Sequence, residues 1–247
     1  MRSLPLLLAL SLTACDAQPP SAEDDPPGGK ADEGTSGQRM PNEIHWQRNS
    51  AEYQAAARQA YRLAAQVLDA RPATEDPWAV VMDADETIID NSTYQKERAA
   101  QGLGYSAESW REWVARKAAP AVPGAKAFIE HVHDLGGLVF VVSNRASAEC
   151  DDTKANFRMV GLKPDLVLCK TDDSEKEPRF AMIEAGTASA ELPAAPIVLF
   201  VGDNITDFPD LDQDVRQAGD DGFTQFGARF IVIPNPMYGS WERNARD

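Results

Sequence analysis

Five short apolar runs recur along the chain, and their spacing constrains the fold more than any other feature. They are Trp78–Met82, Leu138–Val142, Leu166–Cys169, Ile197–Val201 and Phe230–Ile233. Each run is almost continuously apolar, which is typical of strands that are buried on both faces of a sheet. Helical patterns separate most of them, over Gly124–Leu135, Ala146–Val160 and Lys176–Ala185. Strands that alternate with helices predict an α/β domain with a doubly wound, parallel, five-stranded sheet.

Two segments that flank the first strand complete the predicted domain, which spans residues 41–247. Apolar side chains at helical spacing predict a helix that ends before Pro72, with Asn49–Ser50 as a cap. These side chains are Trp46, Tyr53, Ala57, Tyr61, Ala64, Ala65 and Leu68. Residues 91–120 separate the first two strands and are predicted to form a small helical cap over the strand ends. The aromatic residues of this cap are Tyr94, Tyr105, Trp110 and Trp113, of which Trp113 is expected to pack inside it.

The first forty residues differ in composition from this domain. The sequence MRSLPLLLALSLTAC has one basic residue, an apolar run and small residues before Cys15, so residues 1–14 are interpreted as a secretory signal peptide. The stretch Leu12–Cys15 resembles a bacterial lipoprotein signal, which predicts lipidation of Cys15; an ordinary signal peptide is the alternative. Residues 15–40 are rich in Pro, Gly, Ser and acids, which predicts a lipid-anchored flexible linker. We therefore expect export and anchoring to a bacterial membrane, at the outer membrane or the periplasmic face.

Charge and residue counts exclude several classes of protein. The formal net charge is −15, from 24 basic and 39 acidic residues, and such a chain is a poor nucleic-acid binder because phosphates need clustered Lys and Arg. Only His45, His131 and His133 are present, which argues against a His-rich metal site or a histidine nucleophile. The sequence also lacks the HExxH, GxSxG and P-loop motifs.

Acidic and hydroxyl side chains follow three of the predicted strands. The first run is followed by Asp83, Asp85 and Thr87, the second by Ser143 and Asn144, and the fourth by Asp203 and Asp207. Ligands of parallel sheets bind beyond the carboxyl ends of the strands, so these side chains predict one functional site. A calcium loop is the alternative for the first cluster, but Ile88 stands where its sharp turn needs a glycine.

The chemistry of these residue types points to phosphoryl transfer. Asp83 and Asp203 are hard oxygen ligands suited to Mg²⁺, which would offset the repulsion between carboxylates. A carboxylate that attacks phosphorus gives an aspartyl-phosphate intermediate. A second acid two residues later, Asp85, can protonate the leaving alcohol and then deprotonate water. Ser143 and a lysine could hold the phosphoryl oxygens.

With these motifs in place, the sequence resembles the haloacid dehalogenase (HAD) superfamily, and more closely its class C acid phosphatases, which are bacterial lipoproteins. The stretches that carry the resemblance are IHWQRNSAEYQA, MDADETIIDNSTY, AVPGAKAF, VFVVSNR, SEKEPRF, FVGDNITDF and PNPMYGSWE. They run from Ile44 to Glu242, almost the whole predicted domain. The resemblance implies a HAD-like α/β fold with a small cap and one Mg²⁺ per chain.

The resemblance also implies a role for each matching residue. Asp83 would be the nucleophile and Asp85 the acid/base. The metal would be held by the Asp83 side chain, the Asp85 backbone carbonyl and Asp203, with Asp207 binding it directly or through water. Thr87, Ser143 and Asn144 would contact the nucleophile region and the phosphate. Trp110 and Tyr238 would hold an aromatic or nucleoside part of the substrate.

Three assignments keep alternatives at the sequence level. The phosphate-binding lysine of the superfamily matches Lys176 best, because it opens a helix, and Lys170 directly after a strand is the rival. For Arg145, Arg179 and Trp241 a purely structural role is the alternative to a role in the site: the arginines would pair with acids, and Trp241 would pack. Cys150 and Cys169 fall near one edge of the sheet, so they form either a disulfide or two buried thiols.

The function that follows is an exported, lipid-anchored acid phosphatase that hydrolyses phosphomonoesters, with nucleoside monophosphates as the expected substrates. The expected partners are this small phosphomonoester and the membrane, without nucleic acid; a homodimer is left open. A binding lipoprotein that kept the fold without turnover is an alternative of another class. A phosphotransferase with an alcohol acceptor is a second alternative. A dehalogenase is disfavoured because Asp85 serves a phosphate leaving group.

Overall fold

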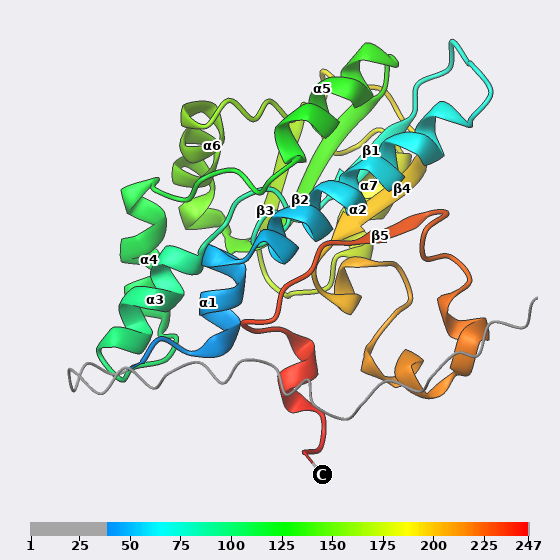
Figure 1. Ribbon diagram of the computed structural model, residues 1–247. Coiled ribbons are helices and arrows are strands. Elements are labelled where there is room, and N and C mark those ends of the chain that lie inside the picture. Colours follow the sequence, from blue (N-terminus) through cyan, green and yellow to red (C-terminus); the bar gives the residue numbers. More distant parts are fainter. Residues whose placement is uncertain (1–38, 247) are drawn as a thin grey trace, which may run out of the picture. The chain divides into compact units, whose positions relative to one another are not determined.

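The computed structural model describes residues 39–246, which contain a five-stranded parallel sheet flanked by helices (Figure 1). The strands are β1 (Ala79–Met82), β2 (Leu138–Ala146), β3 (Leu166–Lys170), β4 (Ile197–Gly202) and β5 (Phe230–Val232), in the order β3-β2-β1-β4-β5. All the pairs are parallel. The predicted doubly wound α/β sheet is therefore confirmed, with β1 at its centre.

The central strands bury alternate side chains on both faces of the sheet. Val80 and Met82 of β1 join the core beneath α2 (Ala51–Asp69) and α5 (Ala125–Asp134), which Figure 1 shows over one face. Ala79 and Val81 join a second core with α7 (Glu177–Glu184). Burial on both faces explains why the runs are apolar at every position rather than at every second one.

The amino-terminal helical pattern is divided into two helices. α1 (Asn42–Asn49) ends before Ser50, and the Ser50 side chain accepts a hydrogen bond from the Tyr53 N–H, at 3.0 Å, to begin α2. The predicted helix-capping pair, Asn49–Ser50, thus lies between two helices. A Ser with extended backbone can accept a hydrogen bond from a free N–H group at the start of the second helix. Residues 1–38 lie outside the described part of the chain. The predicted signal peptide, Cys15 and most of the predicted linker fall in that range.

The segment between β1 and β2 contains α3 (Ser92–Ala100) and α4 (Ala107–Arg116) before the chain reaches α5. Trp113 of α4 is buried, and its indole N–H donates to Asn91 Oδ1 at 2.7 Å. Trp110 stays half-buried and lies edge-on to Tyr94, with ring centroids 5.1 Å apart. Trp113 is therefore a core residue of this segment, whereas Trp110 is partly exposed to solvent.

A disulfide joins Cys150, the first residue of α6 (Cys150–Met159), to Cys169 near the end of β3, with Cα atoms 5.9 Å apart. This resolves the two sequence interpretations in favour of the bonded pair. The helix predicted from Ala146 is wrong at its start, because β2 continues to Ala146 and a short 3-10 turn, Ser147–Glu149, precedes α6. The pairing of β2 with β3 is regular up to Ser143 and Cys169. After a register shift, Ala146 at the end of β2 pairs with Lys170.

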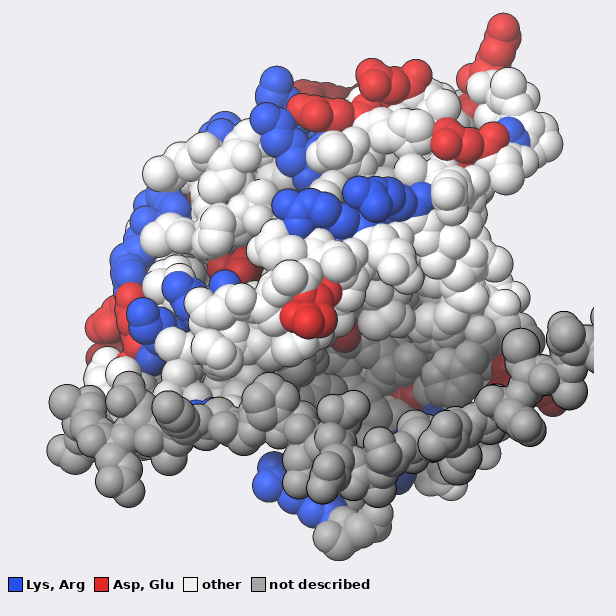
Figure 2. Space-filling view, in the orientation of Figure 1, with Lys and Arg blue, Asp and Glu red and all other residues white. Residues whose placement is uncertain are grey.

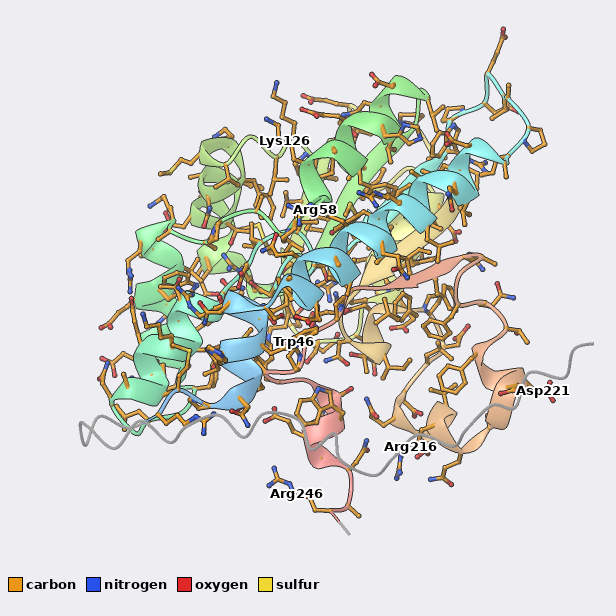
Figure 3. The ribbon with its side chains drawn as sticks, viewed as in Figure 1. Trp46, Arg58, Lys126, Arg216, Asp221 and Arg246 are labelled. Atoms are coloured by element: carbon orange, nitrogen blue, oxygen red, sulfur yellow. A yellow bond between two sulfur atoms is a disulfide. The ribbon has the colours of Figure 1, made fainter. Side chains whose placement is uncertain are left out.

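The surface charge is unevenly distributed despite the net charge of −15. Lys and Arg side chains form a strip along α2 on the face seen in Figure 2. Figure 3 places Arg58 on α2 and Lys126 on α5, and it places Arg216 and Asp221 on the long connection between β4 and β5. Among the described helices, none combines the length and the apolar character that crossing a bilayer requires.

Candidate active site

Asp83 and Asp203 lie at the carboxyl ends of β1 and β4, which are neighbours at the point where the strand order reverses. The Asp83 N–H donates to the Val201 carbonyl oxygen at 2.9 Å, so the ladder between the strands extends to the first acid. Such switch points leave a crevice between the loops that depart in opposite directions. The sheet therefore brings together two acids that are 120 residues apart in the sequence.

Three carboxylates converge in this crevice. Asp83, Asp203 and Asp207 each present an oxygen within 4.8 Å of the others, and Asp207 is supplied by a 3-10 turn, Ile205–Asp207. The Asn204 N–H donates to Asp207 Oδ2 at 2.8 Å. Gly202 permits the arrangement, because a Cβ there would lie well inside van der Waals contact with the Asp207 side chain.

Lys176 lies between two of these acids. Its Nζ donates to Asp83 Oδ1 at 2.5 Å and to Asp207 Oδ1 at 2.7 Å, and the side chain is 3% exposed. Lys170, the rival at the sequence level, ends β3 instead. The structure therefore places Lys176, at the start of α7, beside the expected nucleophile.

Burial raises the pKa values of Asp83 and Asp203. Desolvation raises the pKa of Asp83 to about 7, against the opposing effect of the Lys176 charge. Burial, followed by the charges of Asp207 and Asp83, raises the pKa of Asp203 well above its ordinary value. Burial alone would lower the pKa of Lys176, but the two carboxylates beside it raise the pKa above its ordinary value.

The donor set fits a hard divalent cation. Three carboxylates and the single charge of Lys176 leave the crevice with excess negative charge, and carboxylate oxygens are the ligands that Mg²⁺ selects. A divalent ion there would offset the repulsion between the carboxylates. The predicted metal residues Asp83, Asp203 and Asp207 therefore lie together.

Asp85 has a different position from the other three acids. Its carboxylate accepts hydrogen bonds from Arg145 and Asn91, and among the described residues it is not one of the three carboxylates that converge. Only the backbone carbonyl of Asp85 was expected at the metal, so this placement leaves the side chain available for another role. Arg145 pairs with an acid, the partner that its structural alternative called for.

The predicted phosphate-binding residues divide into buried and open ones. Thr87 and Ser143 are fully buried, and the Thr87 hydroxyl donates to Asp203 Oδ1 at 3.0 Å. Asn144 is exposed at the cavity, where its Oδ1 accepts from Arg179 at 2.7 Å. Arg179 also donates to the Ser143 carbonyl at 2.6 Å. The described bonds of Arg179 go to amide and carbonyl oxygens rather than to an acid, the partner that its structural alternative called for.

A cavity of about 560 Å³ opens above these residues. Asp83, Asp203, Asp207 and Lys176 line it together with Trp110 and Tyr238, so the charged residues and the two predicted aromatic residues share one cavity. Tyr105 and Met237 also line it. The cavity thus combines charged residues with aromatic ones, which suits a ligand with an anionic end and a planar end.

Sequence reasoning missed several residues that support the acids. Glu86 is fully buried at φ 57°, and its carboxylate accepts a hydrogen bond from the Tyr238 hydroxyl. Burial raises the pKa of Glu86 well above its ordinary value. Asn235 donates to Asp203 Oδ2 at 2.9 Å, and the Tyr61 hydroxyl donates to the Thr87 carbonyl at 2.6 Å. Glu86 and Asn235 stand within the motifs MDADETIIDNSTY and PNPMYGSWE, and that position was the available signal.

Comparisons with known proteins, by sequence and by structure, give matches over most of the chain. The sequence model described as HAD superfamily, subfamily IIIB (acid phosphatase) matches residues 33–241. The class C acid phosphatase from Bacillus anthracis is 34% identical, with a TM-score of 0.74, and the match covers 81% of this chain and 85% of that one. A second structure of the Bacillus anthracis enzyme, with tungstate bound, is 32% identical, with a TM-score of 0.72 and the same coverage of 81% and 85%.

Proposed function

The chain belongs to the acid phosphatases of HAD superfamily subfamily IIIB, and from this premise we propose that it hydrolyses phosphomonoesters through an aspartyl-phosphate on Asp83. The observation that carries the proposal is the position of Asp83. Its carboxylate lies at the end of the central strand, contacts Lys176, and lies beside Asp203 and Asp207 at the floor of the cavity. A carboxylate held in this way could attack a phosphate bound in the cavity, while Lys176 offsets part of the negative charge of the site.

We propose Mg²⁺ as the cofactor, one per chain, held by Asp83, Asp203, Asp207 and the backbone carbonyl of Asp85. The support is the excess of carboxylates in the crevice. When bound, the ion supplies positive charge that draws the anionic phosphate towards the anionic nucleophile.

The residues of the chain divide the reaction into two steps. In the first, an Asp83 oxygen forms a bond to phosphorus while the bond from phosphorus to the alcohol oxygen breaks, and Asp85 gives its proton to that oxygen. In the second, water attacks the phosphoryl group, Asp85 takes a proton from the water, and the Asp83 carboxylate leaves. Lys176 offsets negative charge beside Asp83 throughout.

Nucleoside monophosphates are the proposed substrate class. Trp110 and Tyr238 offer aromatic faces to a planar base, and the cavity of about 560 Å³ has room for a nucleoside above the phosphate position. A tetrahedral oxyanion bound to a class C relative, the tungstate complex, supports a phosphate site of the same kind in this chain.

Export with a lipid anchor at Cys15 is part of the proposal. The apolar run before Cys15 and the acidic, Pro-rich linker support it. The disulfide between Cys150 and Cys169 adds support, because structural disulfides persist in oxidising compartments. Mass spectrometry of membrane fractions for diacylglyceryl-modified Cys15, with Cys15→Ser as control, tests this part.

Phosphate release from a panel of monoesters, including nucleoside 5′- and 3′-monophosphates, tests the enzymatic part. The assay compares the protein with Mg²⁺, the protein with chelator and Asp83→Asn. Release that requires Mg²⁺ and is lost in Asp83→Asn is the expected result. Asp134→Asn, an exposed acid at the end of α5, is the matched control and keeps full activity. Release from folded Asp83→Asn at the unaltered rate would overturn the nucleophile assignment.

A further inference from the structure

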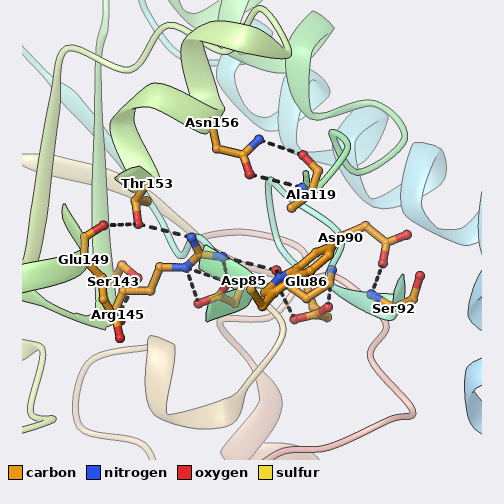
Figure 4. Close-up of polar contacts among 12 residues, drawn as sticks. Asp85, Glu86, Asp90, Ser92, Ala119, Ser143, Arg145, Glu149, Thr153 and Asn156 are labelled. Atoms are coloured by element: carbon orange, nitrogen blue, oxygen red, sulfur yellow. Dashed lines mark hydrogen bonds and ion pairs between the residues drawn. The ribbon is translucent and has the colours of Figure 1, made fainter. Parts of the chain in front are cut away.

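The two oxygens of the Asp85 carboxyl group have unequal surroundings. Oδ1 accepts from Arg145 Nη2 at 2.7 Å, from Asn91 Nδ2 at 2.8 Å and from Arg145 Nε at 3.0 Å. Within residues 39–246, Oδ2 accepts one longer bond, from Arg145 Nε at 3.2 Å. Figure 4 shows these contacts converging on Asp85 from β2 and from the loop after β1. Three donors therefore saturate one oxygen and leave the other with free acceptor capacity.

Arg145 is itself fixed in place. The side chain is about 1% exposed, and Nη1 donates to the Thr153 hydroxyl of α6 at 3.1 Å. Nη2 reaches Asn91 Oδ1 at 3.1 Å as well as Asp85. The guanidinium also lies over the Trp110 ring, 5.3 Å from its centroid. A rigid fork that is bonded on each nitrogen has little freedom to present Asp85 in a second orientation.

Asn91 is held with equal firmness. Its Oδ1 accepts from the Trp113 indole at 2.7 Å, which fixes which end of the amide donates. Nδ2 donates to Asp85 and to Glu86 Oε2, at 3.1 Å for Glu86, and the Tyr238 hydroxyl donates to the same Glu86 oxygen. Tyr238 of the cavity is thus connected to Asp85 through one buried polar network, and Trp110 meets that network only through the Arg145 guanidinium that lies over its ring.

We propose that Arg145 and Asn91 are positioning residues that hold Asp85 by Oδ1, and that Oδ2 is the oxygen that exchanges the proton with the leaving alcohol. The inference rests on the proposed function. As the bond between phosphorus and the alcohol oxygen breaks, the proton on Oδ2 moves to that oxygen. The carboxylate left on Asp85 is stabilised by the charge-assisted bonds that the Arg145 fork already donates to it. Arg145 also lies over the Trp110 ring. One side chain therefore contacts both Trp110, which would hold the leaving group, and Asp85, which would protonate it.

A matched pair of esters tests the inference. The 4-nitrophenyl group leaves phosphate as a stable phenolate that needs little protonation, whereas 4-nitrobenzyl alcohol needs a proton. Both carry the same nitroaromatic ring, and they differ by one methylene between that ring and the ester oxygen. The ratio kcat/KM covers the steps up to release of the alcohol, so hydrolysis of the intermediate does not obscure the comparison.

The variant Arg145→Gln is expected to lose about 100-fold or more in kcat/KM for 4-nitrobenzyl phosphate and less than about 10-fold for 4-nitrophenyl phosphate. Arg145→Lys keeps the charge and most of the volume but lacks the fork, and it is expected to show the same selective loss. Asp85→Asn is expected to show it too, and Arg145→Gln in the Asp85→Asn background is expected to add little further loss.

Arg116→Gln is the matched control, because Arg116 also stacks on a tryptophan, Trp113, and also pairs with a carboxylate, Glu97, but lies outside the cavity. Equal losses for both esters in Arg145→Lys, or full rescue of both by lysine, would overturn the inference while leaving the proposed function intact. Failure of the unaltered protein to cleave either ester would instead overturn the proposed function.

Discussion

The ammonium group of Lys176 lies 2.5 Å from Oδ1 of Asp83, although 93 residues separate them in the sequence. The pair joins the start of α7 to the end of β1, and the same ammonium reaches Asp207 at 2.7 Å. One cation thus neutralises part of a crevice that three acids share, and the remaining charge makes the site sensitive to substitution, to pH and to divalent ions.

Lys176→Met is expected to lower the free energy of unfolding by about 3 kcal/mol or more in chelator at pH 8, because it leaves two buried carboxylates without their partner. Urea denaturation followed by circular dichroism measures the loss. Lys126→Met is the control, since Lys126 is exposed and its nearest acid, Glu130, lies 4.0 Å away; a change below about 0.5 kcal/mol is expected there. Equal effects of the two substitutions would contradict the role of Lys176 as a buried partner.

The stability of the metal-free protein is expected to fall as pH rises from about 4 to about 8. Asp83 has a folded-state pKa raised to about 7, so its neutral form favours the folded state, and that contribution is lost as pH rises through the folded pKa. The raised pKa values of Asp203 and Glu86 act in the same direction. Urea denaturation at pH 5 and pH 8 with chelator measures the change.

Two comparisons isolate the source of that pH dependence. Asp83→Asn removes one titrating group, so the loss of stability between pH 5 and pH 8 is expected to shrink. Saturating Mg²⁺ is expected to restore stability at pH 8 more than at pH 5, because the ion binds the ionised acids. A metal-free protein that gains stability between pH 5 and pH 8 would show that other groups dominate.

Gly202→Ala is expected to weaken divalent-ion binding by about 10–100-fold, because the added Cβ displaces the Asp207 side chain from the carboxylate cluster. Isothermal titration calorimetry with Mg²⁺ measures this directly, without turnover. Gly104→Ala is the control, since its Cβ would meet nothing within 4 Å. Unaltered affinity in Gly202→Ala would remove Asp207 from the proposed metal site.

Reduction of the disulfide is expected to lower the free energy of unfolding by about 3 kcal/mol, since Cys150 and Cys169 close a loop with a sequence separation of 19. Urea denaturation with and without dithiothreitol measures the difference. The double variant Cys150→Ser, Cys169→Ser is expected to match the reduced protein and to be insensitive to the reductant. A sensitivity that persists in the double variant would place the effect elsewhere.

The sheet could be predicted from sequence because its signal is local. Runs such as Val80–Met82 are apolar at every position, and a helical pattern follows most of them. The apolar runs and the helical spacing between them are therefore enough to place the strands. The bounds were less predictable where tertiary pairing decides them. β2 reaches Ala146 only because β3 continues to pair with it across an irregular step after Ser143.

The candidate site was predictable only in part, for a similar reason. Asp83 and Asp203 could be brought together from sequence because both end parallel strands. The bonds of Arg145 could not, since they depend on where Thr153 and Asn91 lie once the cap is packed. The burial of Glu86 could not be predicted, because a glutamate that follows Asp83 and Asp85 in the sequence is typical of a solvent-exposed segment.

The central position of β1 has a consequence for how the molecule opens. Sheets fray from their outer strands, and here those are β3 and β5. The amide of Asp83 is bonded to Val201 on the neighbouring inner strand, so its hydrogen is expected to exchange with solvent only when the whole domain opens. A partly opened molecule therefore keeps its nucleophile on an intact backbone, and the slowest-exchanging amides mark the part of the chain where the chemistry is placed.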